Sequence, residues 1–173
     1  MRTPPRSILA LACLLLPGCL AVGPAQPRPN VLIAAARSPS ALQLDASILD
    51  AYTIPSTASV NAVPVTGWRG TLESGFHSAF PGASSGRTLQ LLQAELSFGA
   101  AAVGMGGTAA VRASIRFKAR LLDASGKELG AVAGTADAHD ANTSASEGGM
   151  TANASEAVEA LYEMLTNEFI SKI

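Results

Sequence analysis

Residues 111–121 read VRASIRFKARL, and this stretch is the strongest indication of the fold. Apolar and polar residues alternate along it without a break, which is typical of a β-strand with one face in the core and one in water. The apolar positions are Val111, Ala113, Ile115, Phe117, Ala119 and Leu121. The opposite face carries the cations Arg112, Arg116, Lys118 and Arg120.

Two further strands are predicted next to this one. Residues 88–98 form the preceding strand, and Leu92, Ala94, Leu96 and Phe98 are expected on one of its faces. Residues 123–127 read DASGK and predict a tight turn, in which Gly126 supplies a positive φ. Residues 128–135 then return as a third antiparallel strand.

The link between the first two of these strands, residues 99–110, is rich in glycine and contains G-x-G-x-x-A at 104–109. A dinucleotide-binding turn of this outline has to open a helix, whose N-terminus receives the pyrophosphate. A strand follows here instead, so we interpret 99–110 as a hairpin loop. Its tip is apolar and uncharged, which makes Val103 and Met105 candidates for docking against a partner or a membrane. The alternative is that the loop folds down onto its own domain.

A helix is predicted after residue 67. Trp68, Leu72, Phe76 and Phe80 recur at every fourth position and form an apolar stripe for the core. Thr66 is expected to cap this helix, and residues 81–82, Pro-Gly, are expected to end it.

A second helix is predicted after Asn153, which forms a capping box with Glu156. Glu156, Glu159 and Glu163 would then complement the positive end of its dipole. Its apolar face comprises Val158, Leu161, Tyr162, Leu165 and Phe169. The preceding residues, 137–151, are small and polar and are expected to form a surface loop.

The N-terminal half of the domain is less regular. Residues 31–36, VLIAAA, predict a buried strand, and residues 41–66, which Pro55 and Pro64 interrupt, predict a short strand or two and an irregular loop. The whole order indicates a single α+β domain over 31–173, in which two helices pack on one face of an antiparallel sheet of about four strands.

The N-terminus has the features of an export signal. Arg2 and Arg6 precede an unbroken apolar run over 8–16, which is much shorter than the roughly 20 residues that span a bilayer. The run ends at Leu16-Pro17-Gly18-Cys19, which resembles the lipobox of bacterial lipoproteins. The resemblance implies a signal peptide over 1–18 and three acyl chains on Cys19, enough for stable anchoring. The alternative is ordinary secretion with cleavage after Ala21.

The composition of the mature chain narrows its partners. Residues 19–30 begin with the acylated cysteine and contain three prolines, so they predict an extended tether. Removing Arg2 and Arg6 would leave ten basic residues against thirteen acidic ones, which argues against nucleic acid. Cys19 would be the only cysteine left, so neither a disulfide nor a cysteine metal site is expected.

The turn RLLDASGKELG over 120–130, the preceding helix and the C-terminal amphipathic helix resemble small outer-membrane lipoproteins of bacteria. The lipopolysaccharide-assembly lipoprotein, the YajG-like lipoproteins and the auxiliary lipoproteins of ABC-type transporters share this plan. The resemblance implies a lipid-anchored protein on the periplasmic face of the outer membrane, because Leu20, and not an aspartate, follows the acylated cysteine and so favours the outer membrane over retention in the inner one. It also implies an envelope protein as partner.

Neither histidine predicts a catalytic site. His77 lies in the first helix and His139 in the polar loop, each without a serine or cysteine at a recognisable spacing. Residues 137–140, DAHD, have no second cluster of ligands that would favour a metal. We therefore expect no enzyme activity, no cofactor and no metal.

Three functions stay open at this level. The first is a non-enzymatic accessory subunit of an envelope transport or assembly machine. The second is a module that binds a lipid or glycolipid, in which Arg112, Arg116, Lys118 and Arg120 meet phosphates. Against this stands the simpler interpretation that Glu95 and Glu128 on neighbouring strands pair with these cations. The third and most distant function is a secreted hydrolase.

Overall fold

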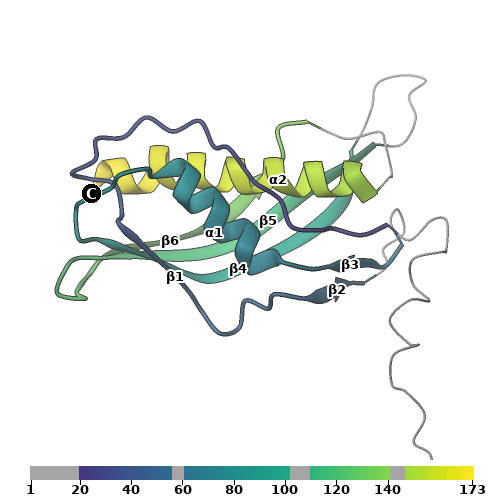
Figure 1. Ribbon diagram of the computed structural model, residues 1–173, viewed down its shortest axis with the longest axis horizontal. Coiled ribbons are helices and arrows are strands. Elements are labelled where there is room, and N and C mark those ends of the chain that lie inside the picture. Colours follow the sequence, from purple (N-terminus) through teal and green to yellow (C-terminus); the bar gives the residue numbers. More distant parts are fainter. Residues whose placement is uncertain (1–19, 56–60, 102–109, 141–146) are drawn as a thin grey trace, which may run out of the picture.

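The computed structural model describes residues 20–55, 61–101, 110–140 and 147–173, which fold into a sheet covered by helices (Figure 1). The main sheet has the order β1-β4-β5-β6, and β2 and β3 form a separate antiparallel hairpin. The strands are β1 (Ala41–Leu44), β2 (Tyr52–Ile54), β3 (Val63–Val65), β4 (Thr88–Ala101), β5 (Ala110–Leu122) and β6 (Glu128–Asp137). β4, β5 and β6 are antiparallel, whereas β1 runs parallel to β4.

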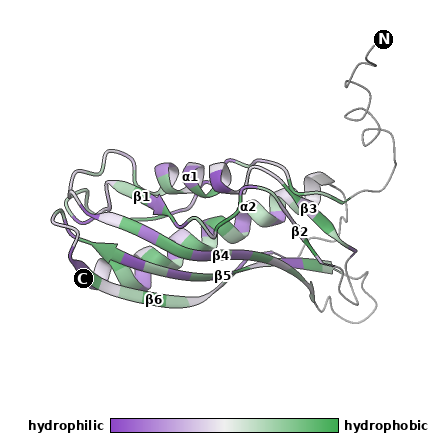
Figure 2. Cartoon of the chain, turned by 90° about the horizontal axis from the view of Figure 1, so that it is seen from below, coloured by the Kyte–Doolittle hydropathy of each residue, from purple (hydrophilic) through white to green (hydrophobic). Residues whose placement is uncertain are grey.

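Both helices lie on the same face of the main sheet, and the other face carries no helix among the described residues (Figure 2). α1 is Trp68–Ala79 and α2 is Glu147–Met164. α2 continues into a π-helical turn, η2 (Leu165–Phe169), and a short 3₁₀ turn, η3 (Ile170–Lys172). The predicted α+β class with two helices on one face of the sheet is therefore confirmed.

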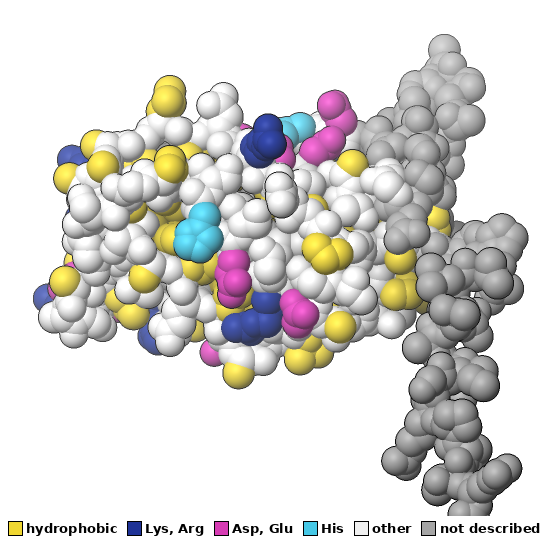
Figure 3. All heavy atoms as spheres, viewed as in Figure 1, with side chains coloured by type: hydrophobic (Ala, Val, Ile, Leu, Met, Phe, Trp, Pro, Cys, Tyr) yellow, Lys and Arg dark blue, Asp and Glu magenta, His cyan; other side chains and the backbone are white. Residues whose placement is uncertain are grey.

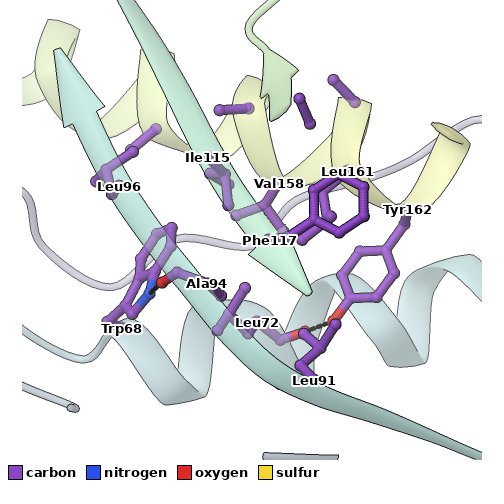
Figure 4. Packing of buried hydrophobic residues seen from close by; sticks show 14 of the residues in the cluster. Trp68, Leu72, Leu91, Ala94, Leu96, Ile115, Phe117, Val158, Leu161 and Tyr162 are labelled. Carbon is purple, nitrogen blue, oxygen red and sulfur yellow. Dashed lines mark hydrogen bonds between the residues drawn. The ribbon is translucent and has the colours of Figure 1, made fainter. Parts of the chain in front are cut away.

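The core lies between the sheet and the helices (Figure 4). The predicted alternation along β5 is confirmed, because its apolar residues from Ala113 to Leu121 are buried and the intervening residues are not. Trp68 on α1 is buried, and its Nε1 donates to the carbonyl of Ala94 at 3.0 Å. The hydroxyl of Tyr162 on α2 donates to the carbonyl of Leu72 at 2.7 Å, which ties the two helices together. Burial of each large side chain stabilises the fold by about 1.5–3 kcal/mol.

A β-bulge changes which face of β4 is buried. The pairing of β4 with β5 shifts register between Leu91 and Gln93, so Leu91 is buried where the strict alternation predicted Leu92. The prediction for Leu92 was wrong, because one extra residue in a bulge reverses the direction of every side chain before it. The prediction holds beyond the bulge for Ala94, Leu96 and Phe98, which are buried.

Residues 31–36 do not form the predicted buried strand. They have no regular structure, and the side chain of Leu32 is 93% exposed. A strand needs a neighbour for its backbone hydrogen bonds, and the position beside β4 is taken by β1. Within 41–66, where one or two short strands were expected, the structure has three, β1, β2 and β3.

The segment 20–30 is extended, but it packs on the domain rather than forming a tether away from it. Val22 is 2% exposed and exchanges backbone hydrogen bonds with β3, donating to Pro64 and accepting from Thr66. Pro27 and Pro29 are buried, while the residues between and beside them are exposed. Residues 20–30 are therefore packed against the rest of the domain.

Side chains of both helices hold this segment in place. The backbone N–H of Ala25 donates to Thr71 on α1 at 3.1 Å, and that of Gly23 donates to Thr151 on α2 at 3.1 Å. Further along, Glu159 accepts from the N–H of Arg28 at 2.9 Å and Glu163 accepts from that of Asn30 at 2.8 Å. These glutamates therefore bind the N-terminal segment instead of complementing a helix dipole as predicted.

The start of α1 is capped by a distant residue. Gly67 occupies the cap position with φ 66°, and Thr66 makes no capping hydrogen bond there, so the prediction for Thr66 was wrong. Instead the carbonyl of Asp50 accepts from Trp68 at 3.0 Å and its carboxylate accepts from Arg69 at 3.1 Å. An N–H at a helix start needs an acceptor, and here the loop after β1 supplies it.

α2 begins six residues before the predicted capping residue, Asn153, which lies inside the helix and is 1% exposed. Its side-chain oxygen accepts from the backbone N–H of Ala113 on β5, and its amide donates to the carbonyl of Asp140 at 2.9 Å. The capping box was therefore the wrong interpretation of this motif. Met150, also buried, gives the first turns of α2 a place in the core, and the loop predicted for 137–151 is correspondingly shorter.

The two tyrosines of the chain provide a test of this packing. Burial raises the pKa of Tyr52 to about 12 and also raises the pKa of Tyr162. Because the pKa of Tyr52 is higher in the folded than in the unfolded chain, the protonated tyrosine favours folding. Its contribution to stability is complete below pH 10 and is lost as the pH rises from 10 toward 12. We expect ultraviolet titration to show no tyrosinate near pH 10, with the first ionisation missing in Tyr52→Phe. A tyrosine that titrates near 10 in the folded protein would contradict the burial of that residue.

Neither α1 nor α2, nor any other helix of the described part of the chain, is long and apolar enough to cross a membrane. The predicted signal peptide, residues 1–18, and Cys19 lie outside the described residues.

Candidate functional site

The structure places the four predicted cations on the helix-free face of the sheet. Arg112, Arg116 and Lys118 are exposed and Arg120 is half-buried, all on β5. β5 lies between β4 and β6, so the row runs along the middle of this face. The opposite, helix-bearing face shows charged side chains singly or in small mixed groups (Figure 3).

Arg120 is neutralised by its neighbours. Its guanidinium lies 3.6 Å from the carboxylate of Glu128, and its Nε donates to the side chain of Gln90. Pairing between this cation and Glu128 was one of the interpretations left open by the sequence, and for Arg120 it is confirmed. Arg120 is therefore a part of the sheet's own side-chain network rather than a free contact residue.

The other three cations are different. Glu95 on β4 lies directly opposite Arg116 on β5, but no ion pair forms between them. Within the described residues, the side chains of Arg112, Arg116 and Lys118 have neither a hydrogen bond nor an ion pair. On the β6 side, Arg116 faces Thr135 and Lys118 faces Ala133, which are too short to cover them. We call Arg112, Arg116 and Lys118 the cation row.

The spacing within the cation row limits what it can bind. Residues two apart on a strand are separated by about 7 Å, and residues four apart by about 14 Å. Arg116 and Lys118 are therefore close neighbours, whereas Arg112 is a separate contact point. The row suits an extended anionic surface better than a single phosphate group.

The predicted docking residues, Val103 and Met105, lie outside the described residues, as do the other residues of 102–109. The ends of β4 and β5 that flank them lie at the same end of the molecule as the start of the described chain (Figure 1). The glycine-rich motif is followed by a strand, β5, and not by the helix that a dinucleotide-binding turn has to open.

Two hollows of the surface were not predicted. One, of about 240 Å³, lies between β4 and the loop after β1, and its walls include Tyr52, Trp68 and the exposed Leu49. The other, of about 220 Å³, lies between β6 and η2, and its walls include Phe117, Gly134 and Met164. Neither contains a residue of the cation row.

The histidines have ordinary contacts. Nε2 of His139 lies 3.3 Å from a carboxylate oxygen of Glu163, and the ring of His77 packs edge-on against Phe76. Within the described residues, no three His, Cys, Asp or Glu side chains gather in a way that could hold a metal ion. Asp137 accepts a hydrogen bond from Ser114 instead.

Asn153 is the buried polar residue whose role sequence reasoning missed. It lies four positions before Ala157 and eight before Leu161, on the apolar stripe of α2, and this placement was the available signal. Its role is to join α2 to β5. Comparison of the chain with family models, curated proteins and solved structures finds no match to any of the three.

Proposed function

We propose that this chain is a lipid-anchored envelope protein that binds a protein partner through the helix-free face of its sheet. It acts as a non-enzymatic accessory subunit of a transport or assembly machine on the periplasmic face of the outer membrane. The observation that supports this most is the cation row, three cations on the helix-free face that have no partner among the described residues. A charged row of this kind steers association and sets specificity toward an acidic partner surface.

The geometry of the row favours a protein surface over an isolated lipid headgroup. A headgroup phosphate is held by donors that converge on one point. The cation row instead spreads over seven residues of one strand, which is about 20 Å. Carboxylates on a partner's strand or helix can match such a spacing one by one.

The packed N-terminal segment also supports this arrangement. With acyl chains on Cys19, the domain would begin directly at the membrane, because residues 20–30 are bound to α1 and α2 and leave no free linker. The chain enters at one end of the long axis of the molecule, and β5 runs along that axis (Figure 1). The cation row then extends away from the bilayer and faces a neighbouring protein.

The test is an affinity purification of the acylated protein from cross-linked, detergent-solubilised envelopes, read by mass spectrometry. We expect one stoichiometric envelope protein with the parent chain. Arg116→Glu with Lys118→Glu should reduce its recovery at least tenfold. Lys127→Glu with Lys172→Glu makes the same change in net charge at exposed cations outside the row and should leave recovery unchanged.

Two outcomes contradict the proposal. Equal loss in both double variants would mean that net charge, and not the row, determines binding. Lipid or glycolipid that copurifies without a protein, and is lost only in the Arg116 and Lys118 variant, would replace the proposal by the second function, a lipid-binding module.

A further inference from the structure

β6 forms an unprotected border of the sheet. Its outer side pairs with no strand in the described chain, and the residues between its charged ends, 129–136, read LGAVAGTA. Natural proteins guard such borders with charges, prolines or short strands, because unpaired N–H and C=O groups recruit other strands. The opposite border has such protection. The border strand β1 has only four residues, and beyond its end the carbonyl of Ala94 on β4 already accepts a hydrogen bond from Trp68.

The register shows which groups of β6 face outward. The N–H of Ala138 donates to the carbonyl of Ala113 at 2.9 Å, which marks this pair as hydrogen-bonded across β5 and β6. Hydrogen-bonded pairs recur at every second residue of an antiparallel ladder, so the even-numbered residues from 130 to 136 bond to β5. The residues between them are Ala131, Ala133 and Thr135, whose backbone N–H and C=O groups point away from β5. No hydrogen bond in the described chain engages these groups.

The helix side of this border is hollow. The 220 Å³ pocket lies between β6 and η2, with Phe117 and Met164 in its walls. Gly134 contributes no side chain there, and a Cβ at this position would lie 3.2 Å from the ring of Phe117. A strand added to β6 would direct every second side chain toward this hollow.

We propose that β6 pairs antiparallel with β6 of a second copy of this chain, about a two-fold axis at Ala133. The two main sheets then form one continuous sheet of twice the width. Such a closed, two-fold contact uses the same patch on both copies. This inference concerns the border of the sheet and does not depend on the proposed partner of its face.

The residues of β6 are self-complementary in this register. Val132 lies opposite Gly134 of the second copy, at the mouth of its hollow, and Gly130 lies opposite Ala136, so each glycine faces a side chain. Glu128 lies opposite Ala138 and Asp137 lies opposite Leu129, so no carboxylate lies directly opposite another. A two-fold axis at Val132 would instead place Gly130 opposite Gly134, so that neither glycine faces a side chain.

The pairing also has a consequence for the cation row. Only the small residues at 131, 133 and 135 of each copy separate the two rows across the joined face. The dimer therefore presents two antiparallel rows of cations on one surface, which doubles the charge available to a partner.

Engineered disulfides test the register directly. In the full chain with Cys13→Ser and Cys19→Ser, kept in mild detergent, we expect Ala133→Cys to form a disulfide-linked dimer on mild oxidation. The two Cα atoms of a hydrogen-bonded pair are about 5.5 Å apart, within the range of a disulfide. Ala131→Cys is the matched control, because its counterpart lies four residues along the partner strand, about 14 Å away, and it should stay monomeric.

Mixing two variants completes the test. Ala131→Cys mixed with Thr135→Cys should give the cross-linked heterodimer, since these positions face each other. Ala133→Pro, which removes an outward N–H without disturbing the ladder to β5, should halve the sedimentation mass at unchanged circular dichroism. Absence of the Ala133→Cys dimer, or equal cross-linking of Ala131→Cys and Ala133→Cys alone, would overturn the proposal.

Discussion

Replacing Asn153 with alanine is expected to lower the free energy of unfolding by about 2–4 kcal/mol. The side-chain oxygen of Asn153 satisfies the N–H of Ala113, a residue on β5 that is fully buried. An unsatisfied buried donor costs about 1–3 kcal/mol, and the lost bond to Asp140 adds about 1 kcal/mol. The effect is large because one side chain joins the helix layer to the middle of the sheet.

Chemical denaturation of the variant and the parent measures this difference. Asn167→Ala is the matched control, because Asn167 is exposed on η2 and its side chain makes no hydrogen bond in the described chain. We expect the control to change stability by less than about 0.5 kcal/mol. Equal effects of the two substitutions would show that Asn153 is not the connection between α2 and β5.

The second large effect is expected at Gly75, where α1 packs directly against α2. A Cβ at this position would lie 2.8 Å from Cγ1 of Val158 and 2.9 Å from the ring of Tyr162. Gly75→Ala should therefore cost about 1–3 kcal/mol, because the helices have to separate or the two side chains have to leave their rotamers. The hydrogen bond from Tyr162 to Leu72 would weaken at the same time.

At Gly70 on the same helix, substitution by alanine is expected to stabilise the protein instead. Gly70 is exposed, and a Cβ there would meet no atom within 4 Å. Gly70→Ala should raise the free energy of unfolding by about 0.5–1 kcal/mol, since glycine loses more backbone entropy than alanine in a helix. Thermal melts of both variants give the comparison, and a stabilised Gly75→Ala would refute the close approach of the helices.

Much of the sheet and both helices could be predicted from the sequence because their patterns are local. The alternation of apolar and polar residues in β5 predicts a half-buried strand, and the four-residue spacing of the apolar residues in α1 predicts a helix. The β-bulge beside Leu92 could not be predicted, because the extra residue is visible only in the pairing with β5. The start of α2 was missed for a similar reason: Asn153 satisfies the local rule for a cap, and its actual partner is Ala113 on a strand.

The position of the N-terminal segment depended on tertiary contacts as well. Prolines at 24, 27 and 29 predict an extended chain, but nothing in them indicates that Glu159 and Glu163 receive its N–H groups. For the candidate site, the four cations and their shared face followed from the alternation alone. The alternation did not indicate which cation is neutralised. Arg120 pairs with Glu128, whereas Arg116, although opposite Glu95, has no ion pair in the described chain.

The central claim is that the helix-free face of the sheet contacts a protein partner, and photo-cross-linking in living cells tests it most directly. A photoreactive amino acid replaces Glu95, exposed on that face beside Arg116, or Glu73, which is also exposed but lies on α1. The proposal predicts a single protein adduct from position 95 and none from position 73. An adduct from position 73 alone, or lipid as the only adduct at position 95, would contradict it.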